Sequence, residues 1–487
     1  LVRSAACSLI EAVASQACPL AVKTQLRLLD SLDESSIHPA EAVRAAAVAG
    51  VRALTWRYFG GHSHAMTVPS ERLISRTVIH YITLATEPAT TNMSRGACKC
   101  LGALPMRLLT ARDTTLDAVL DALAIRAMRY DTVVGEKDAE TRRDALAALA
   151  NIIATVGPSN LTYSRVAKLL TTLVQNACCD YGADKRGDVG SWSRIEGLKA
   201  LVILSTTVNS SRFPQSESAK ERLVSDFEGR ALFFKGREIL CSTKPFLEVH
   251  SMSRWPVGAS EQVCCALMRQ LGEKLDSVRN VALGLFPKFL HTAPVVPARG
   301  NVGILLFSDR ESVDLPARLC ACLALGRVYQ GAVLSGLVIS AGTSNSTVSL
   351  RFREALTQHA IEAYDRQDDQ ALSSLAEALL SLTRALVQAT SEETIRNSLP
   401  VLKCLCALVD ADSFTRFFKM IPNEPENPER FAYCLVDVIS KLIATPKYSK
   451  DVPRLCAAAD VLLAVFQASA ASLTVVVKNS LTGLLRC

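Results

Sequence analysis

The sequence lacks the residue patterns on which most enzymes depend. It contains no glycine-rich loop ending in Gly-Lys-Ser/Thr, no His-Glu-x-x-His pair and no Gly-x-Ser-x-Gly nucleophile motif. No candidate nucleophile has an activating base beside it in the sequence, which disfavours a hydrolase that uses a Cys/His pair. We therefore expect no catalytic residues and no bound cofactor.

Metal sites of the usual spacing are also missing. The 16 cysteines include no Cys-x-x-Cys pair, the spacing that structural zinc sites usually show. They lie on apolar segments, where free cysteine is commonly buried. His62 and His64 could hold a metal, but no third ligand is near them in sequence. We expect reduced thiols packed in a core, as in a cytosolic protein, and no metal.

Long apolar runs and strong charge of one sign are absent as well. No stretch approaches about 18 uncharged apolar residues, so we expect no membrane span, and the start does not resemble a signal peptide. The 54 Lys and Arg against 47 Asp and Glu give a net charge of +7 without a basic run, which argues against nucleic-acid binding. The chain begins at Leu1 inside a repeat, which suggests the C-terminal part of a longer protein.

An arginine-centred pattern recurs along the chain. A residue that is usually small or apolar precedes each arginine, and apolar residues continue at helical spacing. Three positions after the arginine lies a small residue in every copy but one, where it is Leu146. The copies centre on Arg3, Arg44, Arg95, Arg143, Arg194, Arg279 and Arg318. Successive steps are 41, 51, 48, 51, 85 and 39 residues, and the 85 is about twice the others. This period is typical of HEAT or armadillo helix pairs.

These repeats predict an all-α fold, an α-solenoid of HEAT/armadillo-like repeats, and no segment shows convincing strand alternation. We expect HEAT-like repeats over 1–204, one irregular repeat with a polar loop over 205–258, and C-terminal HEAT-like repeats over 259–487. Prolines at 422, 425 and 428 break a helix in the last part. Pro39 predicts a helix start that makes Val43, the residue before Arg44, the fifth helical residue.

The least generic run is YGADKRGDVGSW at residues 181–192. It resembles the DxRGDVGSW signature in the C-terminal region of the tubulin folding cofactor D family. Residues 95–105, 272–279 and 333–342 are similar to further segments of that family in the same order, and we place its C-terminal domain at roughly 160–350. Ser193 and Ile195 depart from the usual pattern, as expected of a divergent member. The run also contains Arg-Gly-Asp, the integrin-binding tripeptide, but the sequence has no secretion signal to support that interpretation.

The resemblance implies a chaperone that binds β-tubulin, works with tubulin folding cofactors C and E and an Arf-like small GTPase, and assembles or dismantles the α/β-tubulin heterodimer. It also implies GTPase activation, a cytoplasmic location and the microtubule cytoskeleton. The GTP belongs to tubulin, so the chain itself needs no catalytic residue. The fold alone is equally compatible with an alternative function, a HEAT-repeat scaffold or transport-type adaptor for a non-tubulin client.

Three residues of this run are candidates for binding a partner: Arg186, Asp188 and Trp192. In the register set by Pro39, Ser193 is the fifth helical residue and Asp188 the N-cap, whose carboxylate accepts backbone N–H groups. A capping box of Ser193 with Glu196 is the rival start. We expect Trp192 to pack against the preceding helix and Arg186 to be free to face an acidic client.

Overall fold

The structure is a computed structural model, and it describes residues 2–60, 70–87, 90–131, 135–136, 138–209, 254–307, 314–343, 346–368, 371, 375, 399, 401–406, 430–444 and 451–468. Most of the predicted polar loop, residues 62 and 64, and the proline-rich break at 421–428 lie outside the described residues. The chain divides into two compact units, and each is described by itself. The first comprises Leu1–Ser216, Arg237–Val263 and Lys288–Val295, and the second comprises Glu217–Gly236, Cys264–Pro287 and Val296–Cys487.

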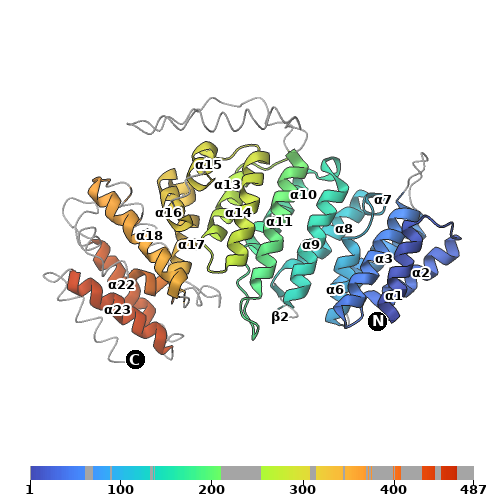
Figure 1. Cartoon of the computed structure of the whole chain (residues 1–487), viewed down its shortest axis with the longest axis horizontal. Coiled ribbons are helices and arrows are strands. Elements are labelled where there is room, and N and C mark those ends of the chain that lie inside the picture. The colour runs from blue at the N-terminus through green and yellow to red at the C-terminus, as the bar shows by residue number, and fades with distance from the viewer. Residues whose placement is uncertain are drawn as a thin grey trace. The chain divides into compact units, whose positions relative to one another are not determined.

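The first unit is a succession of helices (Figure 1). Its elements are α1 (Val2–Ser15), α2 (Val22–Ser36), α3 (Glu41–Phe59), α4 (Glu71–Ile74), the π-helix η1 (Ser75–Ile79), α5 (His80–Thr86), α6 (Thr91–Leu101), α7 (Met106–Leu109), α8 (Asp113–Ala127), α9 (Ala139–Val156), the 3₁₀ helix η2 (Pro158–Asn160), α10 (Tyr163–Leu170), the π-helix η3 (Thr171–Ala177) and α11 (Gly190–Asn209). Helix α3 packs on α1 and α2, α6 on α5, α9 on α8, and α11 on η3. Because α9 also packs on both α6 and α11, the helix pairs stack as a solenoid.

A short hairpin interrupts the helices between α8 and α9. Strand β1 (Tyr130–Asp131) pairs antiparallel with β2 (Gly135–Glu136). Strands of two residues are too short to show an alternating pattern in the sequence. The all-α solenoid class is confirmed.

The repeat arginines occupy the first turns of their helices. Arg44 is the fourth residue of α3, and its Nη1 donates to the carbonyls of His38 and Pro39, at 2.7 Å each. Helix α3 begins only at Glu41, after an extended Ala40 with φ −76° and ψ 123°, so the predicted helix start at Pro39 is wrong. Val43 is accordingly the third helical residue rather than the fifth.

At α9 the repeat arginine is Arg142 rather than the predicted Arg143. Arg142 is the fourth residue of the helix and is 1% exposed, whereas the side chain of Arg143 is 35% exposed. Arg142 therefore occupies the position that Arg44 has in α3, and Arg143 lies on the surface.

Small residues allow close helix contacts, as the pattern predicts. A Cβ atom on Gly197 of α11 would lie 2.6 Å from the Cβ of Ala177 in η3. A Cβ on Gly102, at the end of α6, would lie 2.7 Å from the Cα of Ala148 in α9. Larger side chains at these points would separate the helices.

Ion pairs connect each helix pair to the next. Arg165 Nε donates to Asp117 at 2.7 Å, over a sequence separation of 48 residues. Arg95 Nε donates to Asp138 at 2.8 Å, over 43 residues. Arg76 Nη2 donates to Asp33 at 2.6 Å, also over 43 residues. Each separation is close to one repeat, so these contacts reach only the neighbouring pair.

The second unit contains helices as well. Its elements are α15 (Arg299–Phe307), α16 (Leu315–Ala321), the 3₁₀ helix η7 (Cys322–Leu325), α17 (Arg327–Ala341), α18 (Ser346–Asp365), α22 (Arg430–Ala444) and α23 (Val452–Ala468), while α13 (Ala259–Leu271) and α14 (Asp276–Thr292) contribute residues to both units. A Cβ on Gly272, just after α13, would lie 2.6 Å from the carbonyl carbon of Gly336 in α17, and Ser340 Oγ donates to the Gly272 carbonyl at 2.5 Å. Two of the family-like segments, 272–279 and 333–342, therefore pack directly on each other.

The described cysteines are free thiols. Burial raises the pKa of Cys98, Cys322 and Cys404 to about 12, so these thiols stay protonated at neutral pH. Cys18 and Cys456 are exposed and depart from the expected core packing. In the described part of the chain, no group of three or more His, Cys, Asp or Glu could hold a metal ion, and no helix is both long and apolar enough to cross a membrane.

Candidate partner-binding site

The segment between η3 and α11 is organised by a buried carboxylate, Asp180. Its Oδ2 accepts from Arg142 Nε at 2.8 Å, and both side chains are 2% exposed or less. Its Oδ1 accepts the backbone N–H of Gly182 at 2.9 Å, and its main-chain carbonyl accepts from Arg194 Nη1 at 2.6 Å. The Arg194 guanidinium also stacks on the Tyr181 ring, 4.2 Å from its centroid. These contacts fix the base of the segment against α9 and α11.

The glycines of the signature have distinct structural roles. Asp184 and Gly187 exchange two backbone hydrogen bonds, 3.0 and 2.9 Å long, across a tight turn in which Gly187 has φ +101°. That backbone conformation favours glycine. Gly190 N donates to the Gly182 carbonyl at 2.8 Å, and a Cβ on Gly190 would lie 2.2 Å from the Asp180 carbonyl oxygen. The turn therefore requires glycine at 187, and the start of α11 requires glycine at 190.

Asp188 stabilises the start of α11, as the sequence predicts. Its Oδ1 accepts the backbone N–H of Ser191 at 3.2 Å. The same carboxylate binds Arg194 through Nη1 at 3.2 Å and Nη2 at 2.9 Å and is 11% exposed. Since α11 begins at residue 190, Ser193 is the fourth helical residue rather than the fifth, and the rival start with Glu196 is wrong. Asp188 offers a partner little surface.

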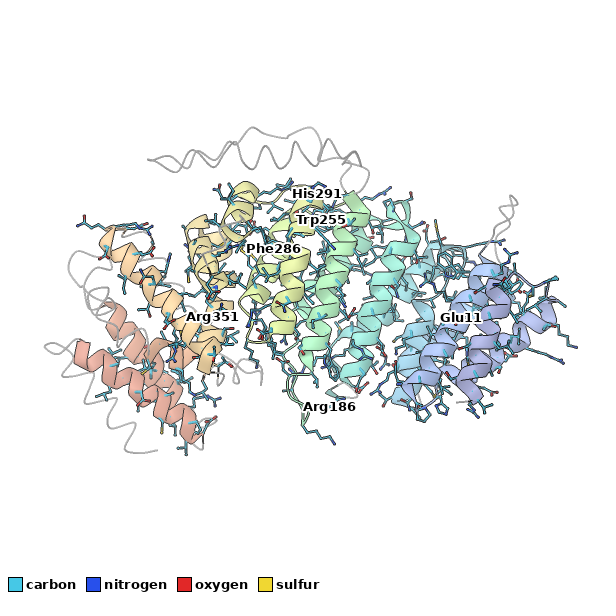
Figure 2. All side chains as sticks on the ribbon, in the orientation of Figure 1. Glu11, Arg186, Trp255, Phe286, His291 and Arg351 are labelled. Carbon is cyan, nitrogen blue, oxygen red and sulfur yellow. The ribbon has the colours of Figure 1, made fainter. Side chains whose placement is uncertain are left out.

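Trp192 and Arg186 form the exposed side of the segment, and Figure 2 labels Arg186 on the loop before α11. Trp192 is half-buried, with the Arg186 guanidinium carbon 5.0 Å and that of Arg143 in α9 6.0 Å from its ring. Arg186 Nη1 donates to Glu140 Oε1 at 2.5 Å, and its Nη2 donates to Asp184 at 2.7 Å. The prediction of a free Arg186 is therefore wrong, because Glu140 in the first turn of α9 supplies a carboxylate from the neighbouring repeat.

The same carboxylates continue the network to α6. Glu140 Oε2 accepts from Arg95 Nη2 at 3.0 Å, and Arg95 binds both oxygens of Asp138 at 2.6 and 2.8 Å. Burial alone would raise the pKa of Asp138, but the bonds from Arg95 and Thr141 outweigh it and hold the pKa well below its usual range. The hydrogen bonds between Arg186 and Asp184 lower the pKa of the Asp184 carboxyl and raise the pKa of the Arg186 guanidinium. Asp138 and Asp184 therefore stay charged at neutral pH.

The exposed part of this cluster is an indole ring between two guanidinium groups. The side chains of Arg186 and Arg143 are 41% and 35% exposed. A partner carboxylate can reach either group only by competing with Glu140, Asp184 or Asp144, whereas an apolar or aromatic side chain can contact the ring directly. The arrangement suits protein recognition and contains no activated nucleophile among the residues named.

Sequence reasoning missed Asp180, Glu140 and Arg143 as members of the cluster. Asp180 and Glu140 lie 38 and 46 residues from the arginines that they bind, so no local spacing marks them. The repeat period supplies a signal, because residues one period apart in a solenoid lie on adjacent helices.

Comparison with known proteins identifies a domain in the second half of the chain. Residues 261–454 match the family model for the tubulin folding cofactor D C terminal. Tubulin-specific chaperone D of Dictyostelium discoideum is 22% identical over 424 residues, which cover 80% of this chain and 26% of that protein. The chain thus spans about a quarter of the length of this curated relative. The matched range shares 261–350 with the predicted range of roughly 160–350, and residues 181–192 lie outside it.

Two solved structures show a weak overall similarity to this chain. Importin beta in an ammonium sulfate condition is 11% identical with a TM-score of 0.34, covering 91% of this chain and 63% of that one. The Kap95:Nup1 complex is 11% identical with a TM-score of 0.32, covering 96% and 60%. The assignment as a solenoid depends on the helix pairs themselves. The family match at residues 261–454 and the similarity to tubulin-specific chaperone D confirm the resemblance found in the sequence.

Proposed function

We propose that the chain is the client-handling C-terminal part of a tubulin-folding chaperone. It binds β-tubulin and acts with tubulin folding cofactors C and E and an Arf-like small GTPase to assemble or dismantle the α/β-tubulin heterodimer. The match of residues 261–454 to the cofactor D family supports this role. On this proposal the protein works in the cytoplasm near microtubules and promotes GTP hydrolysis by tubulin without catalytic residues of its own.

We further propose that the cluster of Trp192, Arg143 and Arg186 contacts the client. It combines the half-buried indole with two partly exposed guanidinium groups, and aromatic and arginine side chains are enriched at binding hot spots. Asp188, the third sequence candidate, supports the cluster by holding the start of α11 through Arg194.

The test is binding of the purified chain to purified α/β-tubulin, measured by analytical ultracentrifugation. We expect a complex that Trp192→Ala weakens about thirtyfold, the loss that corresponds to the roughly 2 kcal/mol of one hot-spot side chain. Arg186→Glu should weaken it to a similar degree. Lys185→Glu is the matched control, since it makes the same charge change at an exposed neighbouring position in the loop.

Unchanged binding in both Arg186→Glu and Trp192→Ala would move the contact elsewhere on the chain. A chain that binds no tubulin, and leaves GTP hydrolysis unchanged when added to tubulin with cofactors C and E, would contradict the chaperone role for this segment. A HEAT-repeat scaffold or adaptor for a different client would then be the better interpretation.

A further inference from the structure

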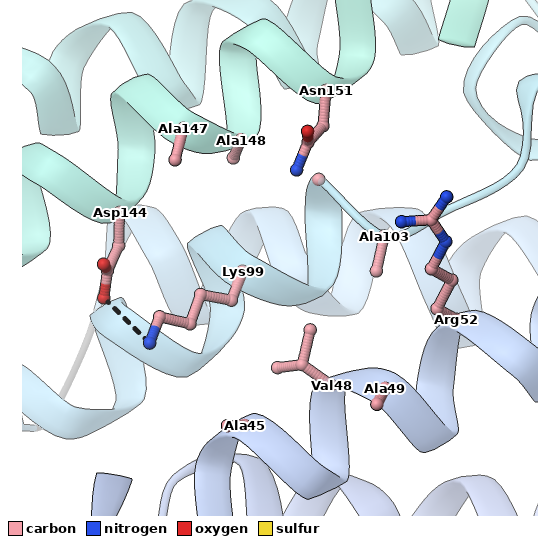
Figure 3. A pocket seen from close by; sticks show the side chains of 11 residues that line it. Ala45, Val48, Ala49, Arg52, Lys99, Ala103, Asp144, Ala147, Ala148 and Asn151 are labelled. Atoms are coloured by element: carbon pink, nitrogen blue, oxygen red, sulfur yellow. Dashed lines mark ion pairs between the residues drawn. The ribbon is translucent and has the colours of Figure 1, made fainter. Parts of the chain in front are cut away.

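A second feature of the first unit lies away from Trp192. The residues of α3, α6 and α9 enclose a groove of about 370 Å³, which we call the α3–α9 groove (Figure 3). Its lining consists mostly of small side chains, and they are Ala45, Val48, Ala49, Gly102, Ala103, Ala147 and Ala148. The volume falls at the lower end of the range of roughly 300–1,000 Å³ typical of binding pockets. Such a floor accepts one or two large apolar side chains from outside.

Arg52 lies at one end of the groove, near Asn151 (Figure 3). Its guanidinium carbon is 5.6 Å from the Trp56 ring, and Trp56 is held by a 2.9 Å bond from its Nε1 to the Ala103 carbonyl. Within the described part of the chain Arg52 makes no ion pair. The groove thus presents an oriented, exposed guanidinium that no described carboxylate pairs with.

Asp144 lines the other end together with Lys99. The Asp144 side chain is only 5% exposed, and its Oδ1 accepts from Arg143 Nε at 2.9 Å. Its Oδ2 lies 3.4 Å from Lys99 Nζ but accepts no hydrogen bond in the described structure. Burial raises the pKa of Asp144, and the nearby Lys99 and Arg143 offset this only in part. A buried oxygen of this kind is stabilised by an additional N–H donor.

We propose that the α3–α9 groove binds an extended, acidic and apolar segment of a partner protein. The segment places a large apolar side chain on the alanine floor, a neighbouring carboxylate on Arg52 and a backbone N–H toward Oδ2 of Asp144. The Asn151 amide can pair with the segment's main chain. A peptide fits better than a nucleic acid, because one unpaired cation beside a carboxylate provides little for a run of phosphates. The proposal is independent of whether the client is tubulin.

The probe is a fluorescein-labelled ten-residue peptide that alternates leucine and glutamate, with binding followed by fluorescence anisotropy. We expect Arg52→Glu to weaken binding at least tenfold. Ala147→Leu, which fills the floor from α9, should have a comparable effect. Arg57→Glu is the matched control, because Arg57 is an exposed arginine on the same helix that does not line the groove. Unchanged melting temperatures would show that the variants remain folded.

Two further peptides test the chemistry of the occupant. Replacing leucine by serine keeps the charge, and replacing glutamate by lysine keeps the apolar side chains, so both should bind at least tenfold more weakly. Equal binding of either peptide, or unchanged binding in Arg52→Glu, would overturn the proposal. Tighter, Arg52-dependent binding of an oligouridine RNA would also overturn it, in favour of nucleic acid.

Discussion

The two sides of the signature segment use the same residue type in different ways. On the buried side, Arg194 is 0% exposed and bonds the Asp180 carbonyl and the Asp188 carboxylate. On the outer side, Arg186 is 41% exposed and pairs with Glu140 and Asp184 in contact with solvent. Desolvated charges are costly to leave unpaired, whereas exposed pairs contribute little. We infer that the first arginine determines the fold and that the second is available for recognition.

Arg194→Ala should have the largest effect on stability. It leaves the Asp188 carboxylate and the Asp180 carbonyl without their shared buried donor, so we expect a loss of about 3–5 kcal/mol in the free energy of unfolding. Urea unfolding followed by circular dichroism measures it. Lys185→Ala on the same loop should change this free energy by less than about 0.5 kcal/mol. Similar values for the two variants would remove the distinction between the two sides.

Asp188→Ala should have the second largest effect, a loss of about 2–3 kcal/mol in the free energy of unfolding. It removes both the bond to the Ser191 N–H and the ion pair to Arg194, and thus exceeds the roughly 1 kcal/mol of a helix cap alone. Asp188→Asn can still accept from Ser191 and should lose less in the same urea experiment. If both substitutions cost equally, the cap contributes nothing and the pair to Arg194 is the whole effect.

The network at Asp138 predicts a dependence on pH. Because its pKa is lowered in the folded protein, its stabilisation is complete above the ordinary Asp pKa and is lost as the pH falls toward the lower folded value. Arg95→Gln removes the main cause of the shift and should cost about 1 kcal/mol near pH 6. The difference in free energy of unfolding between the wild-type protein and Arg95→Gln should shrink steadily as the pH falls to 3. A difference that stays constant over this range would contradict the assigned ion pair.

Arg186→Glu should have the smallest effect on stability. We expect a change below about 1 kcal/mol, since the charges it disturbs are exposed to solvent. Its melting temperature, measured by differential scanning calorimetry, should stay close to that of the unchanged protein while tubulin binding weakens. A large fall in melting temperature would place Arg186 with Arg194 among the residues that determine the fold.

The sequence predicted features that follow from local spacing. The arginine pattern located the first turns of α3, α6 and α11, and its small residues located close contacts such as Gly197 with Ala177. The role of Asp188 at the start of α11 also followed, because a cap acts within a few residues of the helix end. The assignment to Arg143 went against the pattern itself, because Ala145 lies three positions after Arg142 and is small, whereas Leu146 lies three positions after Arg143 and is large.

Partners from other repeats could not be found in this way. The pairs of Arg186 with Glu140 and of Arg142 with Asp180 depend on how α9 and α11 pack, and the groove depends on the approach of α3 to α9. The sequence therefore indicated the Trp192 segment as a candidate site. It also predicted a free Arg186, whereas Glu140 of the neighbouring repeat pairs with that arginine.

The ion pairs between neighbouring helix pairs have a consequence for unfolding. Arg76, Arg95 and Arg165 reach partners 43, 43 and 48 residues away, about one repeat each. When each repeat is stabilised only by its neighbours, the array behaves as a one-dimensional Ising chain. Breaking one interface then destabilises the two repeats beside it and leaves distant repeats folded. Hydrogen exchange of the first unit should then show opening that spreads repeat by repeat from a break such as Arg95→Gln. Damage at one end of a solenoid of this kind remains local, and binding surfaces several repeats away stay formed.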